Sequence, residues 1–190
     1  MALRIIAGGA HGRRLRVPAG GRTRPTSSLV RGALFNMLEH RGWLSDARVI
    51  DLYAGSGALG IEALSRGARA VVFVEASPVV VRTLRGNLRV SGFTRRAEVM
   101  SMAADRALRT LGRRGVRVDG ILADPPYGAG CVQSLVDQVA AGEVLARQGW
   151  LAVEHAVDEP PAERPGLVPV ASRRHGDTAL TLLQRPEATP

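Results

Sequence analysis

Short apolar runs alternate with amphipathic stretches along most of this chain. Mostly apolar runs with the length of buried strands occur at residues 47–52, 70–74, 97–101, 118–123 and 149–154. Stretches with apolar residues every three or four positions, typical of helices, occur at residues 58–66, 78–90, 104–112 and 132–146. This alternation predicts βα units, which build a parallel sheet with helices on both faces.

The C-terminal part departs from this pattern. After a proline-rich connector at 158–166, two apolar runs at 167–174 and 178–184 flank the turn His175-Gly176-Asp177. Such an arrangement predicts an antiparallel hairpin. The expected fold is therefore α/β, Rossmann-like, with a seven-stranded, mostly parallel sheet, helices on both faces and a C-terminal antiparallel hairpin.

The N-terminal part is basic and rich in glycine. Short β-prone pieces at 3–7 and 15–17 predict a small hairpin, followed by a Pro18–Gly21 turn. A helix is then expected from a cap at Thr26 or Ser27 to about residue 41. We expect this hairpin and helix (1–42) to pack as an RNA-facing extension on a main domain (43–185), with a disordered tail at 186–190.

The first predicted strand leads directly into a glycine-rich turn. Asp51 ends the strand, and glycines at 55, 57 and 60 follow before the next helix begins. A strand, a glycine turn and a helix start present backbone N–H groups and the positive end of a helix to a ligand. The spacing also fits the dinucleotide fingerprint, so a nicotinamide cofactor and an ordinary tight turn are alternatives. Asp51 would repel a pyrophosphate, however, and favours the cationic cofactor S-adenosylmethionine.

Two further positions suit a nucleoside ligand and a base. Glu75 ends the second predicted strand, where a carboxylate can accept hydrogen bonds from both ribose hydroxyls. The motif Asp124-Pro125-Pro126-Tyr127 ends the fourth predicted strand. Its prolines make a rigid turn, in which Asp124 and the Pro125 carbonyl can hold an exocyclic amine while Tyr127 stacks on the extruded base. The alternative is a stiff loop with a core tyrosine.

Composition narrows the partners and the chemistry. The net charge is +9, and all 26 basic residues are arginine, so a polyanion such as nucleic acid is the expected partner. The absence of lysine excludes Schiff-base chemistry and a Walker lysine. The lone Cys131 excludes an internal disulfide and fits a reducing, cytoplasmic location. We expect no membrane segment, no signal peptide and no metal site.

The chain resembles the RsmD family of class I methyltransferases, bacterial enzymes that methylate N2 of a guanine in 16S ribosomal RNA. The resemblance covers nearly the whole chain and is carried by Arg4–Gly8, Gly12-Arg13 with Leu15, Arg24-Pro25-Thr26, Leu34-Phe35-Asn36, Asp51–Gly60, Glu62–Ala68, Glu75, Asn87 and Asp124–Tyr127. The chain departs from the family at Leu29 and Gly32, where Arg and Glu are usual, and near Ala103, where an acid is common.

The resemblance implies a mechanism and a set of site residues. S-adenosylmethionine would lie across the strand ends and leave as S-adenosylhomocysteine after in-line methyl transfer to a flipped guanine, position 966 in the family. The substrate would be 16S rRNA or the assembling small ribosomal subunit, and we expect a monomer. The expected cofactor residues are Asp51, Tyr53, Ala54, Gly55, Ser56, Gly57, Glu75 and Ala104. The expected catalytic residues are Asp124, Pro125, Pro126 and Tyr127, and the expected RNA contacts are Arg4, Arg13, Arg14, Arg24, Arg31 and Asn36.

Two other functions use the same features. An adenine-N6 methyltransferase acting on DNA or RNA would need the same Asp124 turn, although the basic N-terminal extension favours the ribosomal substrate. A nucleotide- or RNA-binding module without activity would not need both Asp51 and Asp124.

Overall fold

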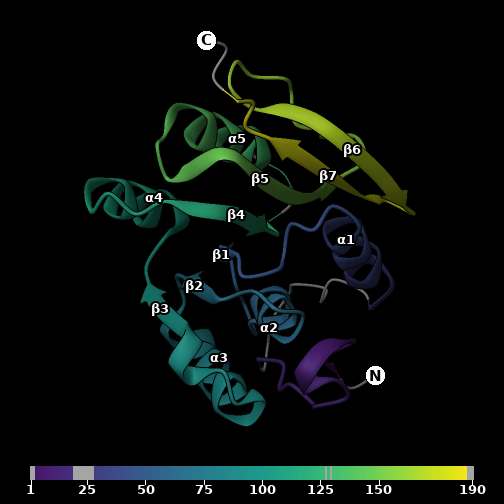
Figure 1. Ribbon diagram of the computed structural model, residues 1–190, viewed down its shortest axis with the longest axis vertical. Helices are drawn as coiled ribbons and strands as arrows, with labels where there is room; N and C mark the ends of the chain where they lie inside the picture. Colours follow the sequence, from purple (N-terminus) through teal and green to yellow (C-terminus); the bar gives the residue numbers. More distant parts are fainter. Residues whose placement is uncertain (1–2, 19–27, 127, 129, 188–190) are drawn as a thin grey trace.

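The sheet predicted from the sequence is present in the computed structural model, which describes residues 3–18, 28–126, 128 and 130–187 (Figure 1). Its strands are β1 (Arg48–Leu52), β2 (Ala70–Glu75), β3 (Ala97–Ser101), β4 (Val118–Ala123), β5 (Leu145–Ala156), β6 (Val168–His175) and β7 (Thr178–Gln184). The strand order is β3-β2-β1-β4-β5-β7-β6. Strands β1 to β5 pair in parallel, whereas β7 pairs antiparallel with both β5 and β6. The seven-stranded, mostly parallel sheet and its C-terminal hairpin are thus confirmed.

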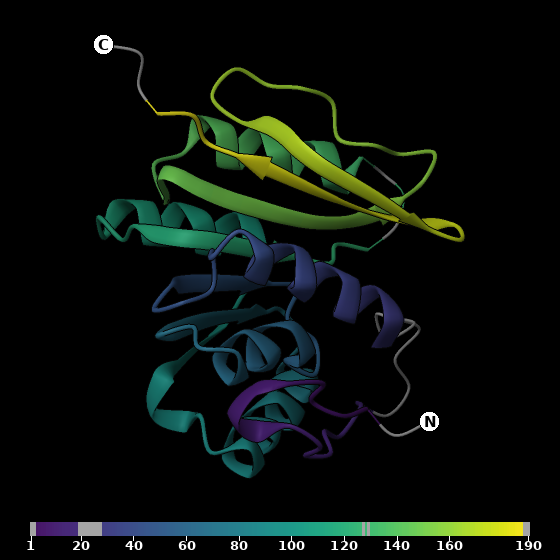
Figure 2. The same ribbon diagram turned by 45° about the vertical axis from the view of Figure 1, so that its right-hand side comes forward.

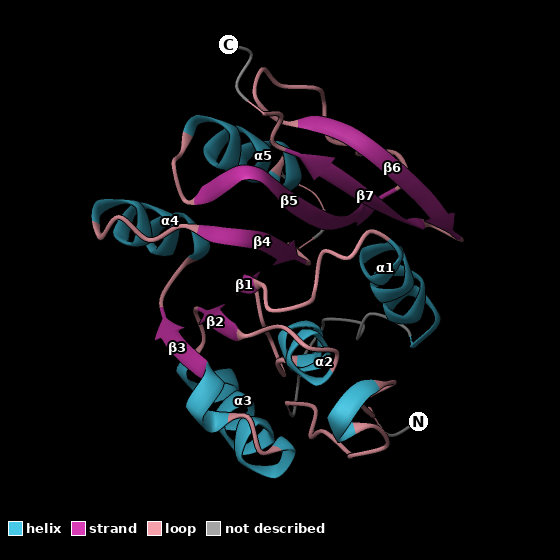
Figure 3. Cartoon of the chain, in the orientation of Figure 1, coloured by secondary structure: helices cyan, strands magenta, loops and turns pink. Residues whose placement is uncertain are grey.

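Helices cover both faces of the sheet, as the turned view also shows (Figure 2). The helices are α1 (Ser28–His40), α2 (Ala58–Ser65), α3 (Pro78–Ser91), α4 (Ala104–Arg113) and α5 (Cys131–Ala141), with short 3₁₀ turns η1 (Gly8–Ala10) and η2 (Thr94–Arg96). Helices α1, α2 and α3 pack on one face in one apolar cluster, and α4 and α5 pack on the other face in a second cluster (Figure 3). Among the described residues, no helix is both long enough and apolar enough to span a bilayer.

The helix expected over 132–146 is present, but its predicted C-terminal end was wrong. Helix α5 ends at Ala141 because Gly142 has an extended backbone, and a Cβ there would meet the Gln138 carbonyl oxygen at 2.8 Å. Residues Val144 and Leu145 are buried instead at the start of β5, where Leu145 pairs with Val118. Apolar residues in this stretch serve a strand rather than a helix, so the helical pattern was misleading.

The N-terminal arm, defined as residues 3–17, forms the predicted hairpin in a reduced form. One antiparallel bridge joins Arg4 to Arg14, supported by hydrogen bonds from the Ile5 N–H to the Arg13 carbonyl (3.0 Å) and from the Leu15 N–H to the Leu3 carbonyl (2.8 Å). The connection is the 3₁₀ turn η1. The predicted cap at Thr26 or Ser27 and most of the Pro18–Gly21 turn lie outside the described residues.

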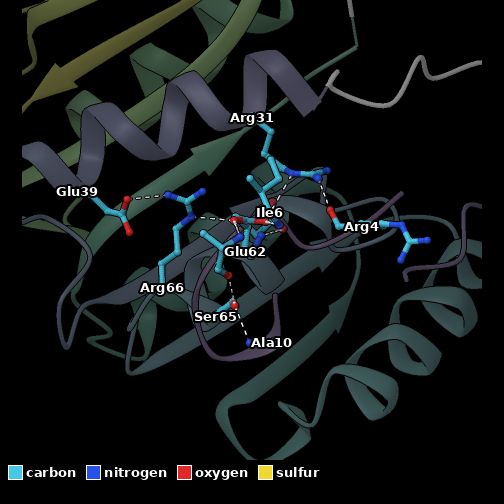
Figure 4. Close-up of polar contacts among 11 residues, drawn as sticks. Arg4, Ile6, Ala10, Arg31, Glu39, Glu62, Ser65 and Arg66 are labelled. Carbon is cyan, nitrogen blue, oxygen red and sulfur yellow. Dashed lines mark hydrogen bonds and ion pairs between the residues drawn. The ribbon is translucent and has the colours of Figure 1, made fainter. Parts of the chain in front are cut away.

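A buried carboxylate fastens the N-terminal arm to α2 (Figure 4). Glu62 accepts hydrogen bonds from the backbone N–H groups of Ile6 (2.8 Å) and Ala7 (3.0 Å). It also binds the Arg66 guanidinium at 2.7 Å, and the Arg31 Nε lies 3.8 Å from it. Two arginines and two amides therefore share one carboxylate that has no solvent exposure.

Candidate active site

Asp51 and Asp124 lie at the same edge of the sheet. Strands β1 and β4 are neighbours and parallel, with Leu52 paired to Ala123, so both strands end at this edge. The two carboxylates are close enough for the charge of Asp124 to raise the pKa of Asp51. In open α/β sheets the carboxyl edge is where ligands bind, so the two acids can serve ligands that bind side by side at this edge.

Burial controls the charge of Asp51. Its side chain is 1% exposed, and burial raises the pKa of its carboxyl to about 7. A hydrogen bond from the Gly60 N–H at 2.8 Å opposes this shift, while the charges of Asp124 and Glu75 add to it. A carboxyl that titrates near neutral pH becomes fully ionised when a cation binds beside it.

Glycine is required in this turn both because of a left-handed backbone conformation and because neighbouring side chains leave no space for a Cβ. Gly57 caps α2 with a φ of 83°, in the left-handed region, and a Cβ there would meet the Leu84 Cδ1 at 2.4 Å. A Cβ at Gly60 would meet the Phe73 ring at 2.3 Å and the Asp51 carboxylate at 2.9 Å. The tight contacts keep the start of α2 close to β1 and β2. Within the turn, Ala54 is buried, and Gly55 and Ser56 are half-buried.

Glu75 supports this turn directly. Its Oε2 accepts a hydrogen bond from the Gly55 N–H (3.0 Å), and its Oε1 accepts one from the Ser77 N–H (2.8 Å). Glu75 therefore links the turn to the start of α3, a role that sequence reasoning missed. Each carboxylate oxygen can accept more than one hydrogen bond, so this role is compatible with a contact to a ligand.

A second group of residues lies at the same edge of the sheet, toward α4 and α5: Tyr53, Ala104 and Cys131. Tyr53 is half-buried with a φ of 59°, which turns the chain sharply after β1. Burial raises the pKa of the Tyr53 hydroxyl, and the nearby Cys131 and Asp105 raise it further. Ala104 and Cys131 are the first residues of α4 and α5. The starts of two helices thus converge on Tyr53.

The Asp124 turn leaves the sheet directly after β4. Asp124 is half-buried, Pro125 is buried and Pro126 is exposed, whereas Tyr127 lies outside the described residues. The Gly128 N–H donates a hydrogen bond to the Glu159 Oε2 at 3.1 Å. Glu159, in the proline-rich connector, therefore helps to fix the segment after the turn, although nothing in the sequence pattern marked it.

The predicted RNA contacts are exposed, buried or outside the described residues. The exposed ones are Arg4, Arg13 and Arg14 on the N-terminal arm and Asn36 on α1, and Arg24 lies outside the described residues.

Arg31 needs a correction, because it is 1% exposed and points into the protein. Its guanidinium donates to the Arg4 carbonyl and lies beside Glu62 (Figure 4). The family resemblance implied an RNA contact for Arg31, but its buried partners come from the N-terminal arm and α2. Arg31 holds the arm in place rather than facing a ligand.

Two exposed arginines near the site were missed. Arg173 and Arg174 lie near the end of β6, next to the turn that joins it to β7. Because Thr178 pairs with Ala156, this turn lies at the carboxyl end of β5, the same edge as Asp124. The only sequence signal was their position beside a predicted hairpin turn.

Comparisons with known proteins agree with this geometry. The model of a family described as Conserved hypothetical protein 95 matches residues 3–184. YlbH of Bacillus subtilis is 34% identical over 184 residues, which cover 96% of this chain and 99% of the relative. Ribosomal RNA small subunit methyltransferase D of Escherichia coli K12 is 35% identical over 156 residues, 80% of this chain and 71% of the relative. The solved structure of yhhF from Escherichia coli superposes with a TM-score of 0.86 at 32% identity, covering 98% and 99% of the two chains.

Proposed function

The chain belongs to the family described as Conserved hypothetical protein 95, the RsmD family that its sequence resembles, and from this premise we propose that it is an S-adenosylmethionine-dependent rRNA methyltransferase. Its proposed target is the exocyclic N2 amine of a guanine in 16S rRNA, position 966 in the family, either in the free RNA or in the assembling small subunit, in the cytoplasm. The observation that carries the proposal is the placement of Asp51 and Asp124 at one edge of the sheet, on adjacent strands.

The residues at this edge fit the proposed cofactor. The negative charge of the buried Asp51 carboxylate would attract the sulfonium and the ammonium group, and the start of α2 would add the positive end of a helix for the carboxylate of the methionine moiety. Glu75 can accept hydrogen bonds from the ribose, and Tyr53 and Ala104 are proposed to pack against the adenine. When bound, S-adenosylmethionine supplies the methyl group.

Asp124 and the Pro125 carbonyl perform the proposed catalysis by positioning. They accept hydrogen bonds from the N2 amine of the extruded guanine and direct its lone pair at the methyl carbon. The new N–C bond forms as the S–C bond breaks, which leaves a neutral thioether and a cationic amine. Asp124 stabilises that cation, and the extra proton leaves through it to solvent. Tyr127 is proposed to stack on the guanine.

Tritium transfer from labelled cofactor tests the substrate. The purified protein is incubated with small ribosomal subunits, free 16S RNA and duplex DNA, and the labelled nucleoside is identified after digestion. We expect label in N2-methylguanosine from ribosomal RNA. Label in N6-methyladenosine would support the adenine alternative and overturn the proposed amine.

Replacing Glu75 with alanine is expected to weaken S-adenosylmethionine binding by roughly 1–3 kcal/mol, because hydrogen bonds to a charged group are lost. The substitution also frees the Gly55 and Ser77 N–H groups that Glu75 holds. Isothermal titration calorimetry measures the change, with Glu98→Ala on the exposed part of β3 as the control. Equal affinity in the Glu75 variant would contradict the proposed contact.

Cofactor affinity is expected to depend on the ionisation of Asp51. Its pKa is about 7 in the folded protein without ligand, so below that pH the carboxyl is protonated and must release a proton when a cation binds. Affinity should therefore rise with pH up to about 7 and level off above it, with about a tenfold gain between pH 6 and pH 8. Calorimetry in buffers of different ionisation enthalpy measures both the affinity and the proton released. A flat profile without proton release would contradict this role of Asp51.

A further inference from the structure

A buried acid, Glu154, lies beside Asp124 on the next strand. In the parallel pairing of β4 and β5, Ala123 is aligned with Val153, so Asp124 and Glu154 are the next positions in register. Glu154 is 7% exposed and lies level with the residue that follows the end of β4, while β5 itself continues to Ala156.

The side chain of Glu154 lies on the same face of the sheet as Asp51. Residues Ala152 and Leu180 belong to the apolar cluster with α1 and α2, while Val153 belongs to the cluster with α4 and α5. Side chains alternate along a strand, so Glu154 follows Ala152 onto the α1 and α2 face. Asp51 faces α2 as well, through its hydrogen bond with Gly60.

Three carboxylates therefore lie near this edge on adjacent strands, in the order Asp51, Asp124 and Glu154, with Asp51 aligned to Leu122, two residues before Asp124. Neighbouring strands are about 4.8 Å apart. If Asp51 serves the cofactor and Asp124 the reacting amine, Glu154 lies one strand farther from the cofactor, next to the position of the base.

The Watson–Crick edge of guanine presents two adjacent donors, the N2 amine and the N1–H, whereas adenine has an acceptor at N1. A carboxylate is purely an acceptor when ionised and would repel the N1 lone pair of adenine. We propose that Glu154 accepts the hydrogen bond of the guanine N1–H and thereby selects guanine over purines that lack this proton. The inference rests on the proposed function, because it assigns the second donor of the same base.

The test compares two bases that both carry a 2-amino group. Small subunits are reconstituted with ligated 16S RNA that has either guanine or 2,6-diaminopurine at the target position, and kcat/KM is measured with tritiated S-adenosylmethionine. Diaminopurine replaces the N1–H with an acceptor, so the wild-type protein should prefer guanine by about 10- to 100-fold, the range for one good base contact. In Glu154→Gln the amide can donate as well as accept, so the preference should fall at least tenfold. The difference between the bases at C6 is the same for both proteins and cancels in this comparison.

Controls separate a specificity role from a structural one. Glu143→Gln, at an exposed acid beside the start of β5 and far from the strand ends, should keep the wild-type preference. Glu154→Ala removes the acceptor altogether and must also lower the preference for guanine over diaminopurine. This variant serves as the test if the glutamine variant does not fold. Cofactor affinity, measured by calorimetry, should stay within a factor of three in both Glu154 variants.

The outcomes distinguish this inference from the proposed function. A lower kcat/KM for both bases with an unchanged preference would show that Glu154 is structural and would overturn the inference alone. Failure of the wild-type protein to methylate the guanine-containing subunits would overturn the proposed function and the inference with it.

Discussion

Replacing Asp124 with alanine should lower the rate of methyl transfer more than about 100-fold, as expected when a group that positions and stabilises a reacting atom is lost. Cofactor binding should survive, because Asp124 lies on β4 and the cofactor residues lie around β1 and β2. Its charge raises the pKa of Asp51. The variant should therefore bind S-adenosylmethionine slightly more tightly than the wild-type protein near pH 6, and equally well at pH 8.

Single-turnover kinetics and calorimetry on the same preparation measure both effects. Asp124→Asn is the matched variant, because its side-chain carbonyl can still accept a hydrogen bond from the amine but cannot take up a proton. We expect its rate to lie between those of the wild-type and alanine proteins. Turnover of the alanine variant at the wild-type rate would remove Asp124 from the mechanism.

Replacing Glu62 with alanine should lower the free energy of unfolding by about 3–5 kcal/mol, the cost of removing one partner from a buried ion pair. The side chains of Glu62 and Arg66 are 1% and 3% exposed, and Arg31 is buried beside them. Without Glu62, the buried Arg31 would lose the acid beside it, Arg66 would keep only the more exposed Glu39, and the N–H groups of Ile6 and Ala7 would lose their acceptor.

Glu39 provides a matched control, since it binds the same Arg66 at 2.7 Å but has a side chain that is 45% exposed. Glu39→Ala should cost less than about 1 kcal/mol, as is usual for exposed ion pairs. Urea denaturation followed by circular dichroism measures both variants, and Glu62→Gln, which keeps the size of the side chain, replaces the alanine variant if that does not fold. Equal losses for Glu62 and Glu39 would contradict the central role of Glu62 in anchoring the N-terminal arm.

The parallel part of the sheet could be predicted because its signals are local. The strands before Asp51, Glu75 and Asp124 are short apolar runs, each followed by a turn with glycine or proline. The boundary between α5 and β5 could not be predicted, because Val144 and Leu145 continue an apolar pattern that fits either a helix or a strand. Leu145 belongs to β5 because it pairs with Val118, and that contact joins residues far apart in the chain.

The candidate site, too, could be predicted from the sequence only in part. The turns that carry Asp51 and Asp124 could be predicted, since strand ends in such sheets meet at one edge. The burial of Arg31 could not, because Glu62 and the Arg4 carbonyl come from other elements. The places of Glu154 and Glu159 depend on strand register and on a connector that folds back toward the Asp124 turn. Neither leaves a mark in the spacing of the sequence.

Mass spectrometry of 16S rRNA from cells that lack this protein tests the central claim most directly. The account predicts that one N2-methylguanosine disappears and returns when the wild-type gene is restored, but not when the Asp124→Ala gene is. An unchanged set of N2-methylguanosines in the deletion strain would contradict it.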